Sequence, residues 1–205
     1  MTTLNIYPLS NYSFAAKDVQ MEEDPSVNAR LQRLEADYEQ YGMRRTVEGL
    51  LIVHEHDHPH VLLLQVGNAF FKLPGSYLKA HETEEEGLKE RLHIALGPEN
   101  KDGEVLMDGT STAEGWQISD SVAQFWRPNF ESFMYPYVPA HISKPKEVKT
   151  WYLVQLPQRQ VLTVPKNMKL VALPLFELYD NAVRYGPQLA AIPHILSRVK
   201  FVPQS

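Results

Sequence analysis

"GSYLKAHETEEEGLKERLHIALG", residues 75–97, is a glycine-led loop that continues into an acidic helical pattern. Thr83 is followed three residues later by Glu86, and this capping-box pattern is typical of the first turn of a helix. Two more glutamates fall in that turn, where the helix dipole favours negative charge. The stretch therefore predicts a helix that starts after Thr83 and is closed by Gly97, and its local structure already accounts for most of its acidity.

The composition around this stretch is that of a folded protein. The chain has 205 residues, 43% hydrophobic and 22% charged, which suits one well-buried α+β domain and excludes wholesale disorder. It has no run of 18 apolar residues and no signal-peptide pattern at its N-terminus, so we expect no membrane segment. The absence of cysteine excludes disulfides and thiolate metal sites and fits an intracellular protein.

The formal net charge of −5 limits how the protein could hold nucleic acid. A protein that binds mainly by neutralising phosphates is expected to be basic. Any RNA or DNA site should therefore be small and built from contacts with bases.

Hydrophobic periodicity predicts a first helix between an extended lead-in over residues 5–23 and Gly42. We expect Asp24 to be its N-cap and Pro25 its first residue, and Gly42 to stop it. Its apolar residues recur at helical spacing and are Val27, Leu31, Leu34, Tyr38 and Tyr41.

Apolar, β-rich segments predict the strands. They are residues 46–54, 60–66, 69–73, 116–126 and 149–156. The first two are expected to form a hairpin through a turn over residues 55–59, and short helices are expected over 175–181 and 187–198. We expect a single domain over 1–205, with a lead-in and helix over 1–42, a core over 43–175 and a helical extension over 176–205.

The opening stretch resembles the Nudix box, a pattern of Gly, five residues, Glu, seven residues and Arg-Glu-aliphatic-x-Glu-Glu-x-Gly. Glu82, Leu92 and Gly97 match this pattern. The leading Gly falls on Ser76, the Arg on Glu90, and the three helical Glu on Arg91, Ile94 and Ala95. The resemblance implies an α+β fold, a Nudix-like α/β/α sandwich with a mixed central sheet plus N- and C-terminal extensions.

The three mismatched glutamate positions lie on one helix face, because residues at i, i+3 and i+4 are neighbours there. Three carboxylates on that face could hold Mg²⁺. One cation and two apolar groups could not, so we expect no catalytic residue, no metal and no cofactor. Glu82, Glu86 and Glu90 form a separate stripe that we expect to be a solvated edge.

A narrower resemblance covers nearly the whole chain. It rests on "NIYPLSNYSF" (5–14), "GMRRTVEG" (42–49), "VHEH" (53–56), "PHVLLLQ" (59–65), "FFKLPG" (70–75), "WRPNFE" (126–131), "YPYVPAHISKPKE" (135–147), "VPKNMKLVALPLFELYDN" (164–181) and "YGP" (185–187). These segments are similar to the small, Nudix-fold subunit of cleavage factor I, the pre-mRNA 3′-end processing factor. The resemblance implies a nuclear homodimer without hydrolase activity that binds UGUA elements in single-stranded RNA. It also implies that the protein binds a larger subunit carrying an RNA-recognition domain and other 3′-end processing factors. It implies no membrane partner.

The same resemblance implies the RNA-contacting residues. They are Glu22, Arg30, Glu48, Phe70, Leu73, Tyr185 and Gly186. Single-stranded RNA is recognised by stacking bases on aromatic faces and by hydrogen bonds to base edges, and these residue types supply both. Taken singly, Phe70 is more typical of a core residue and Glu48 of an ion-pair partner. Ala69 departs from the family, in which a hydroxyl residue often precedes the two phenylalanines.

Two alternatives follow from the same residues. One is a divergent Nudix hydrolase, or a binder of dinucleoside polyphosphates such as diadenosine tetraphosphate. The other is a Zn²⁺ site in "HEHDHPH", where His54, His56, His58 and His60 alternate. The turn signal over residues 57–59 should break that alternation, which favours exposed hairpin histidines.

Overall fold

The computed structural model describes residues 1–68, 70–98 and 115–205. The strands are β1 (Thr3–Ile6), β2 (Tyr12–Lys17), β3 (Arg44–Glu55), β4 (His58–Val66), β5 (Phe70–Lys72), β6 (Gly75–Tyr77), β7 (Gln117–Arg127), β8 (Glu147–Gln155), β9 (Gln160–Pro165), β10 (Met168–Pro174) and β11 (Lys200–Pro203). The helices are α1 (Val27–Tyr41), α2 (Glu84–Leu96), α3 (Leu175–Leu178), α4 (Ala182–Tyr185), α5 (Pro187–Ala190) and α6 (Ile192–Leu196), with a 3-10 turn at Leu9–Asn11.

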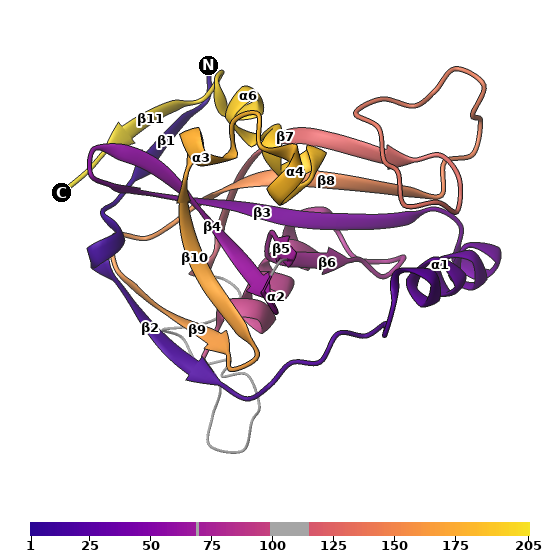
Figure 1. Ribbon diagram of the computed structural model, residues 1–205, viewed down its shortest axis with the longest axis horizontal. Helices are drawn as coiled ribbons and strands as arrows, with labels where there is room; N and C mark the ends of the chain where they lie inside the picture. Colours follow the sequence, from indigo (N-terminus) through magenta and orange to yellow (C-terminus); the bar gives the residue numbers. More distant parts are fainter. Residues whose placement is uncertain (69, 99–114) are drawn as a thin grey trace.

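A mixed sheet in the order β10-β4-β3-β8-β7 forms the centre of the molecule (Figure 1). β3 and β8 run parallel, while the other neighbours on this path are antiparallel. β5 adds to β4, and β6 adds to the other half of β3. The long β3 therefore contacts strands from both halves of the sequence, and its run Leu50–Val53 is buried on both faces.

Helices cover both faces of this sheet. On one face, Leu88, Leu92 and Leu96 of α2 pack in the cluster that contains Leu51 of β3. On the other, the short helices α3 to α6 pack over the cluster that contains Leu50 (Figure 1). Alternate side chains of β3 thus enter opposite layers, as strand geometry requires. The predicted α/β/α sandwich with a mixed sheet is confirmed.

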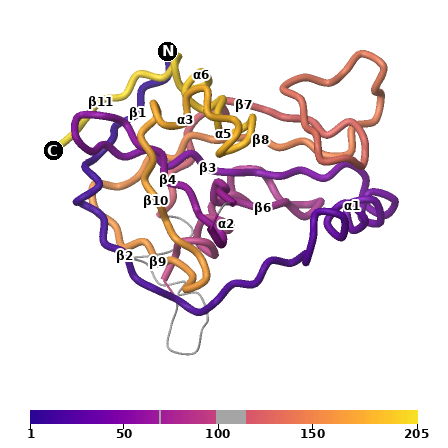
Figure 2. Tube along the Cα trace, viewed as in Figure 1, coloured from indigo at the N-terminus to yellow at the C-terminus, as the bar shows by residue number. Residues whose placement is uncertain are grey.

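The lead-in predicted over residues 5–23 contains two strands that the sequence did not indicate. β1 pairs in parallel with β11, so that Thr3 lies opposite Lys200 at the other end of the chain. β2 pairs in parallel with β9. Figure 2 shows the first and last strands side by side as a result. These strands were missed because the partner of each is distant in sequence.

The first helix starts two residues later than predicted. Its N-cap is Ser26, whose hydroxyl accepts from the Ala29 amide at 3.1 Å, so the expectation that Asp24 caps it is wrong. Asp24 is instead bound by Arg33. Gly42 ends the helix at φ 79°, as expected, because glycine adopts that conformation at little cost.

The hairpin between β3 and β4 turns at two residues, His56 and Asp57, which both have positive φ. Two-residue turns of this kind match the twist of antiparallel strands. The predicted turn over residues 55–59 was therefore too long, and Pro59 lies within β4 opposite His54.

The predicted helices at the end of the chain are shorter than expected. The first stops at Leu178, before Asp180 with φ 53°, and the second is divided into α5 and α6. No helix in the described ranges is both long and apolar enough to cross a membrane.

Gly75 fixes the junction between β6 and β3. Its φ is 148°, and a Cβ there would lie 2.1 Å from the carbonyl oxygen of Val47. Only glycine permits this close approach, which places β6 against β3 with Gly75 opposite Glu48.

Candidate nucleic-acid interface

Glu48 is held on β3 by two side chains of the neighbouring strand β8. Its Oε2 accepts a hydrogen bond from Trp151 Nε1 at 2.8 Å, and its Oε1 lies 3.1 Å from Lys149 Nζ. The side chain is 15% exposed. Because each carboxylate oxygen has two lone pairs, Glu48 keeps acceptor capacity in a fixed orientation after these contacts.

Lys149 links this carboxylate to the C-terminal helices. Its Nζ also donates to Gln188 Oε1 at 3.5 Å, in the first turn of α5. Gly186 directly precedes that helix with φ 86°, and a Cβ there would meet no atom within 4 Å. Its backbone conformation, rather than space, therefore favours glycine. The structure thus brings the region of Gly186 close to Glu48.

Tyr185 and Leu73 are both buried in the core layer beneath the C-terminal helices. The Tyr185 ring meets Phe71 edge-on at 5.0 Å between centroids, and its hydroxyl donates to Glu177 Oε1 at 3.1 Å. Burial raises the pKa of Tyr185, and the hydrogen bond to Glu177 raises it further. Both predicted site residues pack in the core, and their contact with RNA stays a prediction.

Phe70 is 57% exposed, whereas its neighbour Phe71 is half-buried against Tyr185. Alternation along β5 directs the two rings to opposite sides. One ring is therefore free to stack while the other packs, as the sequence predicts. Ala69, where the chain departs from its family, lies outside the described residues.

Glu22 contacts β5, the strand that carries Phe70. Its Oε1 lies 2.6 Å from the Nζ of Lys72, which follows Phe71 in β5 and shares the side of Phe70. Arg30 is exposed on α1, as expected from its position off the apolar stripe. Within the described ranges, its side chain makes no hydrogen bond or ion pair, so none joins it to the other predicted site residues.

The helix face expected to lack metal ligands is occupied by an ion pair. Arg91 Nη2 lies 2.7 Å from Glu82 Oε2, and both side chains are largely buried. Arg91 also donates from Nε and Nη2 to the carbonyl oxygen of Tyr77 at 3.2 and 3.0 Å. Ile94 is half-exposed and Ala95 packs against the core.

The prediction of a solvated glutamate edge is wrong for Glu82. Burial raises the pKa of this carboxyl, but the hydrogen bond from Arg91, with that from the Lys79 amide, brings it below its usual value. Glu86 and Glu90 are exposed, as expected. Among the described residues, no group of three or more His, Cys, Asp or Glu could hold a metal ion.

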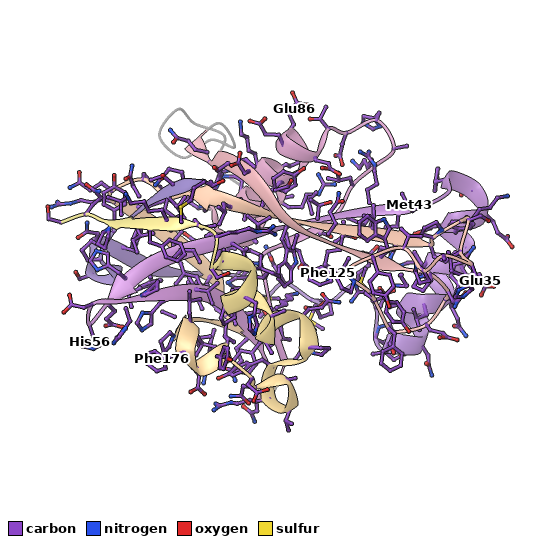
Figure 3. The ribbon with its side chains drawn as sticks, turned by 90° about the horizontal axis from the view of Figure 1, so that it is seen from above. Glu35, Met43, His56, Glu86, Phe125 and Phe176 are labelled. Carbon is purple, nitrogen blue, oxygen red and sulfur yellow. The ribbon has the colours of Figure 1, made fainter. Side chains whose placement is uncertain are left out.

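The alternating histidines have separate environments. His54 Nε2 lies 2.8 Å from the carbonyl oxygen of Gln204, and His60 Nδ1 lies 2.8 Å from that of His58. His56 projects from the end of the hairpin (Figure 3). The ring of Phe176 meets that of His58 edge-on.

The sequence reasoning missed the residues that hold the predicted contacts, namely Trp151, Lys149, Gln188 and Lys72. Trp151 and Lys149 are two apart in a predicted strand and so share a face, which was a usable signal. Their partner Glu48 lies a hundred residues earlier, and no local pattern indicates it.

A family model and two curated relatives show the family of the chain. A Nudix family model, described as a nucleotide hydrolase, matches residues 2–199. The chain is 52% identical over 200 residues to pre-mRNA cleavage factor Im 25 kDa subunit 2 of Arabidopsis thaliana, covering 97% of this chain and 94% of that protein. It is 43% identical over 202 residues to cleavage and polyadenylation specificity factor subunit 5 of Dictyostelium discoideum, covering 98% and 96%. Among solved structures, the MutT protein of Bacillus halodurans is 15% identical, with 78% of this chain and 87% of that chain covered at a TM-score of 0.46.

Proposed function

The chain belongs to the Nudix family and, within it, to the pre-mRNA cleavage factor Im 25 kDa subunits, and on that premise we propose that it binds UGUA elements in single-stranded RNA without hydrolysing nucleotides. The names of its relatives indicate a role in mRNA 3′-end processing. We place this activity in the nucleus, in a homodimer that partners a larger subunit with an RNA-recognition domain and other processing factors.

The observation that carries the proposal is the fixed carboxylate of Glu48. Held by Trp151 and Lys149, it can accept from the amino or imino group of a base without first being ordered. A carboxylate facing RNA repels phosphates, so it suits contact with a base edge. This agrees with the net charge of −5.

The exposed ring of Phe70 supports the same function. Aromatic stacking accepts any base and contributes about 1–3 kcal/mol per base. Arg30 adds a planar set of donors for purine acceptors. In this proposal Phe70 supplies affinity, while Glu48 and Arg30 supply discrimination between sequences.

The ion pair between Arg91 of α2 and Glu82 supports the proposed lack of hydrolysis. The Arg91 guanidinium lies against Glu82, the residue that matches the Nudix glutamate. A cation placed there repels Mg²⁺, and the neighbouring Ile94 and Ala95 offer no oxygen ligand.

The test is fluorescence anisotropy with UGUA-containing and scrambled RNA hexamers, with and without Mg²⁺, across a salt series. We expect UGUA to bind more tightly, with each altered base costing on the order of 1–3 kcal/mol and no need for Mg²⁺. The slope of log K against log salt should be shallow, roughly −1 to −2, because each phosphate contact contributes about −0.7. Equal binding of both RNAs, or the steep slope of a basic groove, would contradict the proposal.

Matched variants separate the site from the rest of the surface. Phe70→Ala should weaken binding by about 1–3 kcal/mol, whereas Phe14→Ala, which removes a similarly exposed ring on β2, should not. Arg30→Ala should cost a similar amount without loss of folding, and Arg159→Ala controls for removal of an exposed positive charge. Equal losses in the site and control variants would point to non-specific attraction.

A further inference from the structure

The helix α1 is anchored to the sheet by few apolar contacts. Of its 15 residues, only Leu34 is buried, while Val27 and Tyr41 are 62% and 66% exposed. At the far end, the ring of Tyr38 meets Phe130 at 5.7 Å between centroids. Because most helices are held by tertiary packing of an apolar face, so little buried surface leaves a larger part for polar contacts in orienting α1.

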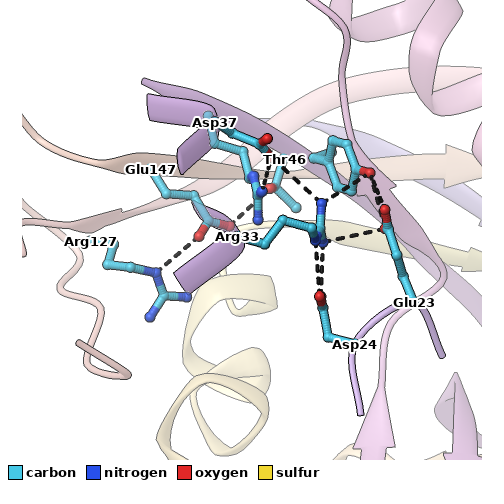
Figure 4. A network of polar contacts seen from close by, with 9 residues as sticks. Glu23, Asp24, Arg33, Asp37, Thr46, Arg127 and Glu147 are labelled. Carbon is cyan, nitrogen blue, oxygen red and sulfur yellow. Dashed lines mark hydrogen bonds and ion pairs between the residues drawn. The ribbon is translucent and has the colours of Figure 1, made fainter. Parts of the chain in front are cut away.

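Arg33, near the middle of α1, supplies such contacts to the segment that precedes the helix. Its Nε and Nη2 donate to the two oxygens of Asp24 at 2.9 and 2.8 Å, a bidentate pair (Figure 4). Its Nη2 also lies 3.3 Å from Glu23 Oε2. The hydrogen bond from Arg33 lowers the pKa of Asp24, which keeps the pair charged. The segment before α1 is thereby folded back onto the helix.

Tyr77 connects this segment to the sheet. Its hydroxyl donates to Glu23 at 2.9 Å and accepts from Arg33 Nη1 at 3.2 Å. The Arg44 guanidinium lies 4.7 Å from its ring centre and pairs with Asp37 of α1 at 2.7 Å. Because Tyr77 is in β6, the contact joins α1 to the strand beside Glu48.

We propose that Arg33, Tyr77, Glu23 and Asp24 form a clamp that positions Glu22 and Arg30 for recognition of RNA bases. Glu22 directly precedes the clamped segment, and Arg30 lies three residues before Arg33 on the same helix, one turn away. The clamp residues act through these neighbours and do not themselves touch RNA. The existence of the clamp rests on the contacts above. Its effect on RNA recognition rests on the proposed RNA-binding function.

The conservative variant is Tyr77→Phe, which removes the hydroxyl that contacts Glu23 and Arg33 but keeps the ring beside Arg44. Its matched control is Tyr152→Phe, because the hydroxyl of Tyr152 also donates to a carboxylate, that of Glu84, on the opposite face of the sheet. Both proteins should melt within a few degrees of the wild type.

The clamp is tested first without RNA, by hydrogen–deuterium exchange of full-length protein. Tyr77→Phe should speed exchange in the peptide that spans residues 18–33 and leave the peptides of β3 and α2 unchanged. Tyr152→Phe should not affect residues 18–33. Unchanged exchange in that peptide for Tyr77→Phe would overturn the clamp, whatever the RNA result.

The second test measures UGUA affinity in a double-mutant cycle. Tyr77→Phe should weaken binding about 2- to 10-fold, the cost of ordering one or two side chains on binding. Arg30→Ala should have a smaller effect in the Tyr77→Phe background than in the wild type, whereas the effect of Phe70→Ala should be the same in both. Additive losses for Tyr77→Phe and Arg30→Ala would refute positioning. If the wild type does not prefer UGUA, the proposed function fails, and the exchange result alone decides whether the clamp exists.

Discussion

Replacing Arg127 by methionine should leave a buried carboxylate without its charge partner. Arg127 Nε lies 2.9 Å from Glu147 Oε2, and the two side chains are 7% and 1% exposed. The other carboxylate oxygen accepts from Thr46 Oγ1 at 2.9 Å (Figure 4). Arg127 Nη1 also donates to the carbonyl oxygen of Glu131 at 2.6 Å, and this contact is lost too.

The magnitude follows from the burial of the pair. Removing one partner of a buried ion pair costs about 3–5 kcal/mol, because the remaining charge stays desolvated. For a chain of this size, each kcal/mol lowers the melting temperature by about 2–4 °C. Arg127→Met should therefore lose roughly 6–20 °C at neutral pH.

The loss of stability in Arg127→Met should depend on pH, and the direction of that dependence follows from the pKa of Glu147. In the wild type, burial raises the pKa of Glu147, but the charge and hydrogen bond of Arg127, together with the charge of Lys149 and the hydrogen bond from Thr46, bring the pKa below its usual value. The stability from this lowered pKa is present above the unfolded pKa of a glutamate and is lost as pH falls through the folded pKa. Without Arg127, burial dominates and the folded pKa lies above the unfolded one, so the variant loses stability as pH rises. The gap between the two proteins should shrink on acidification.

Urea denaturation from neutral to acidic pH measures both effects. The control is the double variant Arg127→Met, Glu147→Gln, which removes both charges and should recover much of the loss. The reasoning is refuted if Arg127→Met lies within about 1 kcal/mol of the wild type at neutral pH, or if the gap widens as the pH falls.

Four further outcomes are expected. Gly75→Ala should cost about 3 kcal/mol or more in thermal melts, because its Cβ would meet the backbone of β3, whereas Gly67→Ala, with positive φ but open space, should cost about 1–2 kcal/mol. Glu48→Gln, which replaces one acceptor oxygen by an NH2 donor, should weaken UGUA binding by about 1–3 kcal/mol in anisotropy titrations while the fold is kept, and unchanged affinity would show that recognition does not need the carboxylate. The wild type should release no mononucleotide from diadenosine tetraphosphate with Mg²⁺ or Mn²⁺, and steady release abolished by Glu82→Gln would contradict this. Stoichiometric Zn²⁺ should leave the melting temperature unchanged, and a rise of several degrees that disappears in His56→Ala would establish a metal site.

The sequence predicted the features that depend on neighbouring residues. The Thr83 hydroxyl accepts from the Glu86 amide, and Gly97 is the C-cap of α2, because both signals act within a turn or so of the helix. The outward position of Arg30 followed from helical periodicity. The exposure of one of two consecutive phenylalanines followed in the same way from strand alternation.

What the sequence could not predict depends on partners far along the chain. β1 and β2 carry no strong strand signal of their own, and each is completed by a strand near or beyond residue 160. The support of Glu48 has the same origin, since it comes from β8. The mistaken N-cap has another cause: Asp24 is a good capping residue, but the bidentate contact with Arg33 competes for its carboxylate.

Two arginines organise the loops that precede the two long helices in the same manner. Arg33 binds Asp24, and Arg91 binds Glu82, each at a separation of nine residues from a helix back to its own lead-in loop. A loop fixed by one guanidinium needs no metal ion to order it, which removes a structural reason to retain the Mg²⁺ ligands of a hydrolase. In the loop before α1, the contact of Arg33 with Asp24 holds the segment that carries Glu22 against the sheet. In the proposed function, therefore, Arg33 and Arg91 are paired with internal carboxylates, and exposed rings and base-edge contacts recognise the RNA.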